Sequence, residues 1–222
     1  MEMRTVYRKK LREIVDDMLA MSSMVGKAIL SSIEALKNRD MDLAHQIITG
    51  DQNVNRKRFE IEEKCIQLIA TQQPMAGDLR VIVAGIIITQ ELERIGDYAV
   101  GIARVVLMIG DEPPLKPLID IPRMAEKAVD MLNRSMDAAV HRDVEAAKKI
   151  AAEDDEVDNL YDQVFRELLT YMMQDPRTII RAERLLWVAH NLERSADRVT
   201  NICERVVFVV TGKMEEIGAS KY

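Results

Sequence analysis

The prolines of this chain occur at only three places, which restricts it to a small number of long helices. Pro74 and Pro176 stand alone, and the other four of the six prolines lie between residues 113 and 122. Proline ends or kinks a helix, so each place predicts a helix boundary. Asp40 and Asp143 predict two more boundaries, because aspartate is a good N-cap. The helices expected between these boundaries cover roughly residues 5–38, 40–73, 76–110, 117–141, 143–173 and 177–212.

The composition favours helices over strands. Hydrophobic residues make up 48% of the chain and charged residues 31%, as in an ordinary globular protein. Aromatic residues make up only 4%, and there are only nine glycines to interrupt a helix. In the last segment, apolar residues recur at three- and four-residue spacing from Leu185 to Val210, which is typical of helices that pack side by side at a shallow angle.

The two halves of the sequence resemble each other. Residues 35–54 match residues 138–157 at an offset of 103, and residues 92–102 match residues 192–202 at an offset of 100. Duplication of a three-helix unit explains this better than chance. We therefore expect an all-α fold, a tandem repeat of two antiparallel three-helix bundles with six long helices, joined end to end or side by side. The two expected units are residues 1–112 and 113–222.

Charge and hydropathy exclude several classes of function. The net charge is −6 and there is no basic tract, so we expect no nucleic-acid binding. The longest uninterrupted apolar run, residues 81–88, is much shorter than the ~20 residues of a membrane span. The polar start of the chain carries no signal-peptide pattern, and Cys65 and Cys203 lie in apolar-periodic segments. We expect a cytoplasmic protein with two buried free thiols.

Four pairs of acidic or amide residues, spaced four apart, follow directly after core positions. They are Asp51/Asn55, Glu93/Asp97, Asp154/Asp158 and Glu193/Asp197. Residues four apart share a helix face, and in each hairpin the two pairs are equally far from the turn, so they are predicted to lie level. Like charges about 4 Å apart repel by roughly 4 kcal/mol at an effective dielectric constant of 20. A cation between them would turn this repulsion into attraction. Oxygen ligands suit magnesium, calcium, manganese or iron.

A second interpretation of these pairs is a solvated edge, in which Arg94 and Arg194 neutralise the neighbouring carboxylates. His190 lies three residues before Glu193 and within reach of it, but its repeat counterpart is Gln90, which favours a core or surface role. The chain contains no Glu-x-x-His motif, no glycine-rich phosphate loop and no nucleophile elbow. We expect no catalytic residues.

Five motifs, spread over both halves in order, resemble the PhoU family of phosphate-transport regulators. They are GDQNVN at 50–55, QP to DLR at 73–80, ELERIGD at 91–97, YMM at 171–173 and LERSADR at 192–198. The resemblance implies two three-helix bundles in a non-enzymatic cytoplasmic protein. It implies a negative regulator of the phosphate-starvation response, acting between the ATPase subunit of the phosphate ABC transporter and a phosphate-sensing histidine kinase. It also suggests a homodimer.

The resemblance further implies metal ions on the Glu/Asp-x-x-x-Asp motifs, here Glu93/Asp97 and Glu193/Asp197, with the other two pairs facing them. The metal would be iron, manganese, zinc or magnesium, including multinuclear clusters. Because Asn55 stands where the second half has Asp158, the first set carries −3 and the second −4. We predict that the second set binds cations more tightly. The alternatives are a metal-dependent hydrolase and a purely structural helical bundle.

Overall fold

The structure, a computed structural model, describes residues 2–217. Within that range it is all-helical and contains no strand, which confirms the predicted fold class. The elements, in order, are α1 (Glu2–Asn38), α2 (Met41–Gln72), α3 (Gly77–Ile109), α4 (Asp120–His141), α5 (Val144–Ala152), α6 (Asp154–Gln174), the short 3₁₀ helix η1 (Pro176–Thr178) and α7 (Ile179–Thr211).

The predicted boundaries have the expected chemistry. The side chain of Asp40 caps α2 by accepting a hydrogen bond from the Leu43 amide at 2.8 Å. The side chain of Asp143 caps α5 in the same way, at 2.9 Å from the Ala146 amide. At the end of α2, Gln73 turns into the left-handed region at φ 45, directly before Pro74. These turns therefore depend on local features, capping residues and a proline, that can be recognised in the sequence.

The fifth expected helix is interrupted, which the sequence did not predict. It divides into α5 and α6 at Glu153. The Glu153 carboxylate accepts hydrogen bonds from Arg134 at 2.6 and 2.8 Å and from Lys127 at 2.7 Å, both on α4. The Arg134 hydrogen bonds are the main reason that the pKa of Glu153 falls to about 2. Its repeat counterpart, Gly50, has no side chain to make such contacts and lies within the continuous helix α2.

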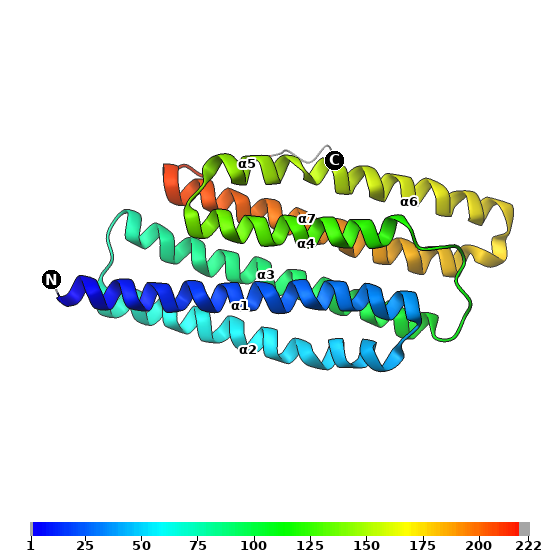
Figure 1. The fold of residues 1–222 in the computed structure, drawn as a ribbon, viewed down its shortest axis with the longest axis horizontal. Coiled ribbons are helices and arrows are strands. Elements are labelled where there is room, and N and C mark those ends of the chain that lie inside the picture. The colour runs from blue at the N-terminus through cyan, green and yellow to red at the C-terminus, as the bar shows by residue number, and fades with distance from the viewer. Residues whose placement is uncertain (1, 218–222) are drawn as a thin grey trace.

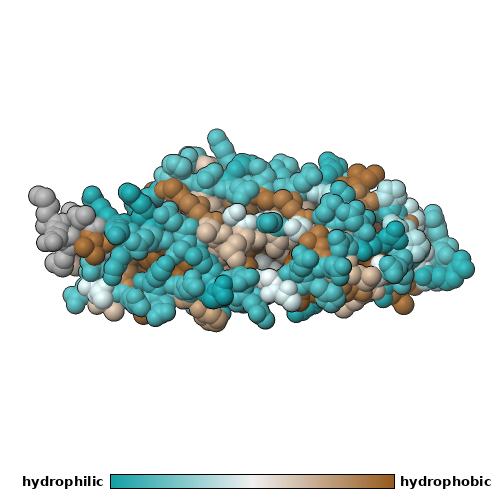
Figure 2. Space-filling view, turned by 60° about the horizontal axis from the view of Figure 1, so that its bottom comes forward, coloured by the Kyte–Doolittle hydropathy of each residue, from teal (hydrophilic) through white to brown (hydrophobic). Residues whose placement is uncertain are grey.

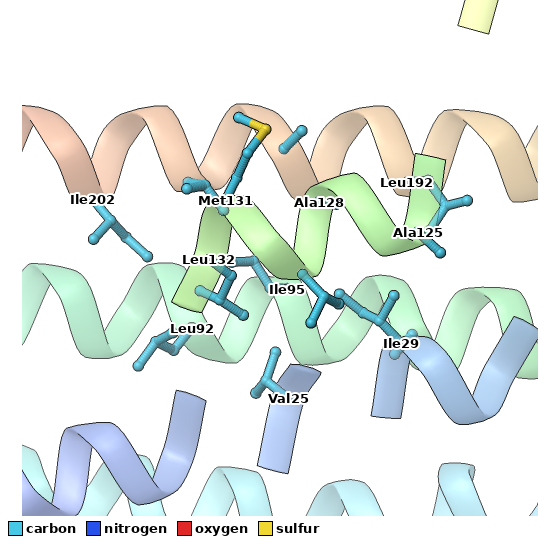
Figure 3. Close-up of a cluster of buried hydrophobic side chains, with 14 of the residues drawn as sticks. Val25, Ile29, Leu92, Ile95, Ala125, Ala128, Met131, Leu132, Leu192 and Ile202 are labelled. Carbon is cyan, nitrogen blue, oxygen red and sulfur yellow. The ribbon is translucent and has the colours of Figure 1, made fainter. Parts of the chain in front are cut away.

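The two three-helix bundles lie side by side (Figure 1). Helices α3 and α7 run antiparallel along the middle of the molecule, and α1 lies beside α4. Figure 3 shows side chains of both halves, among them Val25, Ile95, Leu132 and Leu192, meeting in one cluster. The buried apolar residues of the two halves thus form one continuous core. The division into residues 1–112 and 113–222 stays a prediction.

Both cysteines lie in this core, as expected. Cys65 and Cys203 are free and fully buried. Burial raises the pKa of the Cys65 thiol to about 11 and that of Cys203 to about 12. Both therefore stay protonated near neutral pH and act as small apolar side chains.

The surface drawn in Figure 2 is largely hydrophilic, and apolar side chains emerge in separate small areas. Among the described residues, one helical stretch, Val6–Asn38, is long and apolar enough by composition to cross a membrane. It contains no long uninterrupted apolar run, because its apolar residues are interspersed with polar ones. Half of its apolar window is buried, and Met21, Val25 and Ile29 are core residues. This is the pattern of a helix at the centre of a bundle.

Candidate functional site

The structure gathers the four predicted pairs into two sets, one in each hairpin. The first acidic set is Asp51, Asn55, Glu93 and Asp97 of α2 and α3, and the second acidic set is Asp154, Asp158, Glu193 and Asp197 of α6 and α7. The predicted level arrangement is confirmed. A Cβ atom on Gly96 would lie 3.6 Å from Oδ1 of Asp51, and the charge of Asp97 raises the Asp51 pKa. In the second set, the charge of Asp197 raises the Asp154 pKa.

The first acidic set is largely compensated by its own neighbours. Asn55 donates a 2.6 Å hydrogen bond from Nδ2 to Oδ2 of Asp51. Arg58 places a guanidinium nitrogen 3.7 Å from the Glu93 carboxylate. Burial and the charge of Asp97 raise the pKa of both Asp51 and Glu93, while Arg104 opposes the rise at Asp51. Every carboxylate in this set except Asp97, which is exposed, therefore has a polar or cationic neighbour.

The second acidic set is not compensated to the same degree. Oδ1 of Asp154 and Oε2 of Glu193 are buried and accept no hydrogen bond. Burial, followed by the charges of Asp197 and Asp158, raises the pKa of both Asp154 and Glu193 to about 7. Asp197 receives a hydrogen bond of 3.1 Å from Arg194, although burial still raises its pKa. The set thus holds excess negative charge against the core, which a cation would relieve.

Two aromatic side chains replace polar ones at the edge of the second acidic set. His190 lies with Nδ1 3.4 Å from Oε2 of Glu193, at a side-chain exposure of 46%. The ring of Tyr161 lies 6.3 Å from that of His190. Burial lowers the His190 pKa, so the imidazole is neutral near pH 7 and does not balance Glu193. The three-residue spacing between His190 and Glu193 was the signal that linked it to the site.

Arg58 is the residue that sequence reasoning missed. The neutralising arginines expected were Arg94 and Arg194. Arg94 does lower the Glu93 pKa, but the charge of Arg58 lowers it more. The repeat contained a signal for this difference. A cationic residue, Arg58, stands where the second half has the neutral Tyr161, so the positive charge near the two acidic sets differs.

Among residues 2–217, no three His, Cys, Asp or Glu side chains converge closely enough to form a ready-made metal site. The donor chemistry of the second acidic set nevertheless fits a hard cation, because two of its carboxylate oxygens are buried and accept no hydrogen bond. Binding would require its side chains to change rotamer so that they converge. In the first set, Asn55 and Arg58 already occupy two of the acidic side chains, and the fit is poorer.

Fold and site together define a class: a duplicated three-helix bundle that carries a set of acidic side chains in each hairpin. The PhoU domain family matches this chain twice, at residues 18–106 and 121–206, once in each half. The chain therefore belongs to the PhoU family.

Relatives of this chain carry the same kind of name. It is 40% identical to the phosphate-specific transport system accessory protein PhoU homolog of Aquifex aeolicus over 206 residues, 93% of each chain. It is 37% identical to the homolog of Clostridium acetobutylicum, over 96% of this chain and 98% of that protein. It is 36% identical to the accessory protein PhoU of Escherichia coli, over 93% of this chain and 86% of that protein.

Solved structures share the fold. The crystal structure of PhoU from Pseudomonas aeruginosa matches with a TM-score of 0.88 and 32% identity, over 93% of this chain and all of that one. The phosphate transport system regulatory protein PhoU from Streptococcus pneumoniae matches with a TM-score of 0.88 and 28% identity, over 94% of this chain and 99% of that one. The similarity therefore extends over both bundles and their arrangement.

Proposed function

We propose that this chain is a non-enzymatic regulator of phosphate transport. Its relatives are accessory proteins of a phosphate-specific transport system and match nearly its whole length. In this proposal it represses the phosphate-starvation response when phosphate is plentiful. It does so in the cytoplasm, as a homodimer that acts as an adaptor between the ATPase subunit of the phosphate ABC transporter and a phosphate-sensing histidine kinase.

We further propose that the regulator is tuned by divalent or transition metal ions, and the second acidic set is the observation that carries this. Asp154, Asp158, Glu193 and Asp197 would hold the ion, drawn from iron, manganese, zinc or magnesium. The ion would supply positive charge where two buried carboxylate oxygens accept no hydrogen bond. The first acidic set would bind the same ions more weakly, since Asn55 replaces a carboxylate and Arg58 competes for Glu93.

The position of the second acidic set suggests how occupancy would affect the rest of the chain. Asp154 is the first residue of α6, directly after the interruption at Glu153. Neutralising Asp154 and Glu193 would remove repulsion between α6 and α7 next to the break between α5 and α6. The α5–α6 junction is therefore the element whose geometry we expect to respond to the ion.

Elemental analysis is the direct test of the metal proposal. The untagged protein, purified without chelator, is compared with a variant in which Glu93, Asp97, Glu193 and Asp197 are alanine. Stoichiometric metal in the parent and none in the variant would support the two sites. No metal in either protein, even after soaking with iron or manganese, would reduce the pairs to a solvated edge of a structural bundle.

A reporter assay tests the regulatory role separately. In a strain that lacks its own copy, the chain should repress a phosphate-starvation-responsive promoter in phosphate-rich medium. Unchanged promoter activity, with the protein present and folded, would contradict the regulatory role. Phosphoester turnover by the pure protein, lost in Glu193→Ala, would instead favour a metal-dependent hydrolase.

A further inference from the structure

A cavity lies between the two bundles, towards the end of the molecule where α1 begins and α7 ends (Figure 1). Its volume is about 130 Å³, and helices α1, α3, α4 and α7 all contribute to its lining. The lining is mainly apolar and includes the buried side chains of Met18, Ile88 and Met136. Val140, which is 44% exposed, also lines it, so the cavity reaches the surface. An apolar cavity of about 150 Å³ is large enough to bind benzene, so this one can hold an apolar group of about six carbons.

The internal repeat shows which residues leave this space. Gly85 of α3 and Ala139 of α4 line the cavity, and their repeat counterparts are Leu185 and Leu36. These two leucines line the corresponding place at the opposite end of the molecule, together with the linker that precedes α4. The cavity there measures only about 30 Å³. The larger cavity is therefore a property of one end of the molecule and not a requirement of the fold.

The charged residues that line the cavity are Arg142 and Arg205, and both carry positive charge. Arg142 follows the last residue of α4, has an exposed side chain and forms no ion pair within residues 2–217. Nη2 of Arg205 lies 3.2 Å from Oε2 of Glu204, but that carboxylate also accepts a hydrogen bond from the Ile217 amide. The lining therefore offers cationic groups beside an apolar interior, which is complementary to a ligand with an apolar body and an anionic group.

Carboxylates on the neighbouring turns lie outside the lining. Asp17 of α1 accepts hydrogen bonds from two lysines of α2, and Asp143 caps α5. Burial and the charge of Asp78 raise the Tyr7 pKa, whereas the charge of Arg142 lowers it. Asp78 and Arg142 thus both lie near Tyr7, and Asp78 is the carboxylate with which an anionic ligand has to compete. The ligand has the advantage that its apolar body is buried in the cavity at the same time.

We propose that this cavity binds a small amphipathic anion, a carboxylate with an unbranched alkyl chain of about six to eight carbons. The chain lies among Met18, Ile88 and Met136, and the carboxylate pairs with Arg142 at the surface, beside Arg205. A cationic ligand with the same chain is disfavoured, because the charged groups of the lining are arginines. The ligand contacts helices of both bundles, and its binding requires neither a metal ion nor the proposed regulatory role.

Three probes that share one chain and differ in their head group test the proposal. They are octanoate, octanol and octylammonium, titrated into the full chain by calorimetry below their micelle concentrations. We expect octanoate to bind saturably, once per chain, and at least about tenfold more tightly than octylammonium, with octanol between them. The net charge of −6 attracts the cation to the rest of the surface, so a preference for the anion points to a local cationic site.

Matched variants assign the binding to the cavity. Ala139→Leu introduces the residue of the repeat counterpart and should weaken octanoate binding by about tenfold or more, because the side chain fills the space. Ala70→Leu is the control, since this exposed position lies on α2, outside the four helices of the lining, and binding should not change. Arg142→Gln should weaken the binding of octanoate and leave that of octanol unchanged. Circular dichroism confirms folding, and Arg142→Gln keeps the test valid if Ala139→Leu does not fold.

Methionine methyl resonances locate the ligand independently. Met18 and Met136 line the cavity, whereas Met173 is 78% exposed on α6. In protein labelled with ¹³C at the methionine methyl groups, octanoate should shift the resonances of Met18 and Met136 and leave that of Met173 unchanged. Substitution of each methionine by leucine assigns its resonance.

Several outcomes would overturn the proposal. Absence of saturable octanoate binding at millimolar concentration would show that the cavity is only a packing void. Equal affinity for the three probes would remove the role of the arginines, and equal weakening by Ala139→Leu and Ala70→Leu would place the binding elsewhere. Binding to phosphatidylglycerol vesicles, lost in Arg142→Gln, without binding of octanoate would indicate a membrane surface instead of a small ligand.

Discussion

The two hairpins of this protein have the same fold but not the same electrostatics. In the α2–α3 hairpin, Asn55 and Arg58 satisfy the neighbouring carboxylates. In the α6–α7 hairpin, Asp158 and Tyr161 stand at those positions, and buried carboxylate oxygens of Asp154 and Glu193 accept no hydrogen bond. The bundle therefore does not need an uncompensated cluster, because one of its two copies folds with most of the charge balanced. The excess charge of the second hairpin is a candidate for function rather than for stability.

The largest expected difference between the hairpins is in cation affinity. Glu193→Gln should weaken Mn²⁺ binding to the second acidic set by about 100-fold, because it removes one of four carboxylates from a half-buried site. The matched change Glu93→Gln should weaken total binding much less, since that carboxylate is already shared with Arg58. Isothermal titration calorimetry measures both. Equal losses from the two variants would contradict the ranking of the sites.

The interruption at Glu153 should be the next largest difference. Glu153→Gly removes the carboxylate that Arg134 and Lys127 share and leaves both cations without it. We expect the free energy of unfolding to fall by about 2 kcal/mol in urea denaturation. Gly50→Glu is the control, since a Cβ there would meet nothing within 4 Å and the helix loses a glycine. That control should be neutral or slightly stabilising, and a loss as large as that of Glu153→Gly would refute the explanation.

The pH dependence of stability should report on the second acidic set. The pKa values of Asp154 and Glu193 are raised to about 7, well above their values of about 4 in the unfolded chain. The folded metal-free protein therefore binds more protons between these limits and loses stability as the pH rises from about 4 through 7. Allowing for solvent screening at these half-buried groups, we expect a loss on the order of 2 kcal/mol. Urea denaturation between pH 5 and 8 measures it.

The control for the pH experiment is the double variant Asp154→Asn, Glu193→Gln. Its free energy of unfolding should change less over the same pH range, because the groups that take up the protons are absent. A pH profile identical to that of the parent would assign the dependence to other groups.

The smallest expected effect comes from exchanging Arg58 and Tyr161. Arg58→Tyr should strengthen cation binding at the first acidic set by about fivefold, since it removes the guanidinium near Glu93. Tyr161→Arg should weaken binding at the second set by a similar factor. Competition with a fluorescent Mn²⁺ indicator is sensitive enough to detect both. If neither substitution alters affinity, the arginine does not account for the difference between the hairpins.

Local and periodic features of the fold were predictable from sequence. Asp40 and Asp143 predict the starts of two helices because aspartate is a good N-cap. Pro74 marks a turn from which Asp51 and Asp97 are equally distant in sequence. The level arrangement of the acidic pairs followed from that symmetry and from helical spacing alone. Such features depend on a few neighbouring residues and on the geometry of a single hairpin.

Features that depend on contacts between distant helices were not predictable in the same way. Glu153, where the helix breaks, is bonded to Arg134 and Lys127 of α4, and nothing at position 153 itself reveals these contacts. Arg58 reaches Glu93 through the conformation of a long side chain, which the spacing of residues does not determine. The compensation of one acidic set and not the other is therefore a tertiary property.

The continuous core places a limit on how this architecture can be recombined. Apolar residues of α1 and α3 pack directly against those of α4 and α7. Each half therefore buries apolar side chains of the other. A chimera joining the first half of one relative to the second half of another would place apolar faces together whose side chains do not fit each other. It would therefore lose packing along the whole contact between the halves. The two halves therefore share one interior, and an apolar substitution in one half has to fit the side chains of the other half that face it.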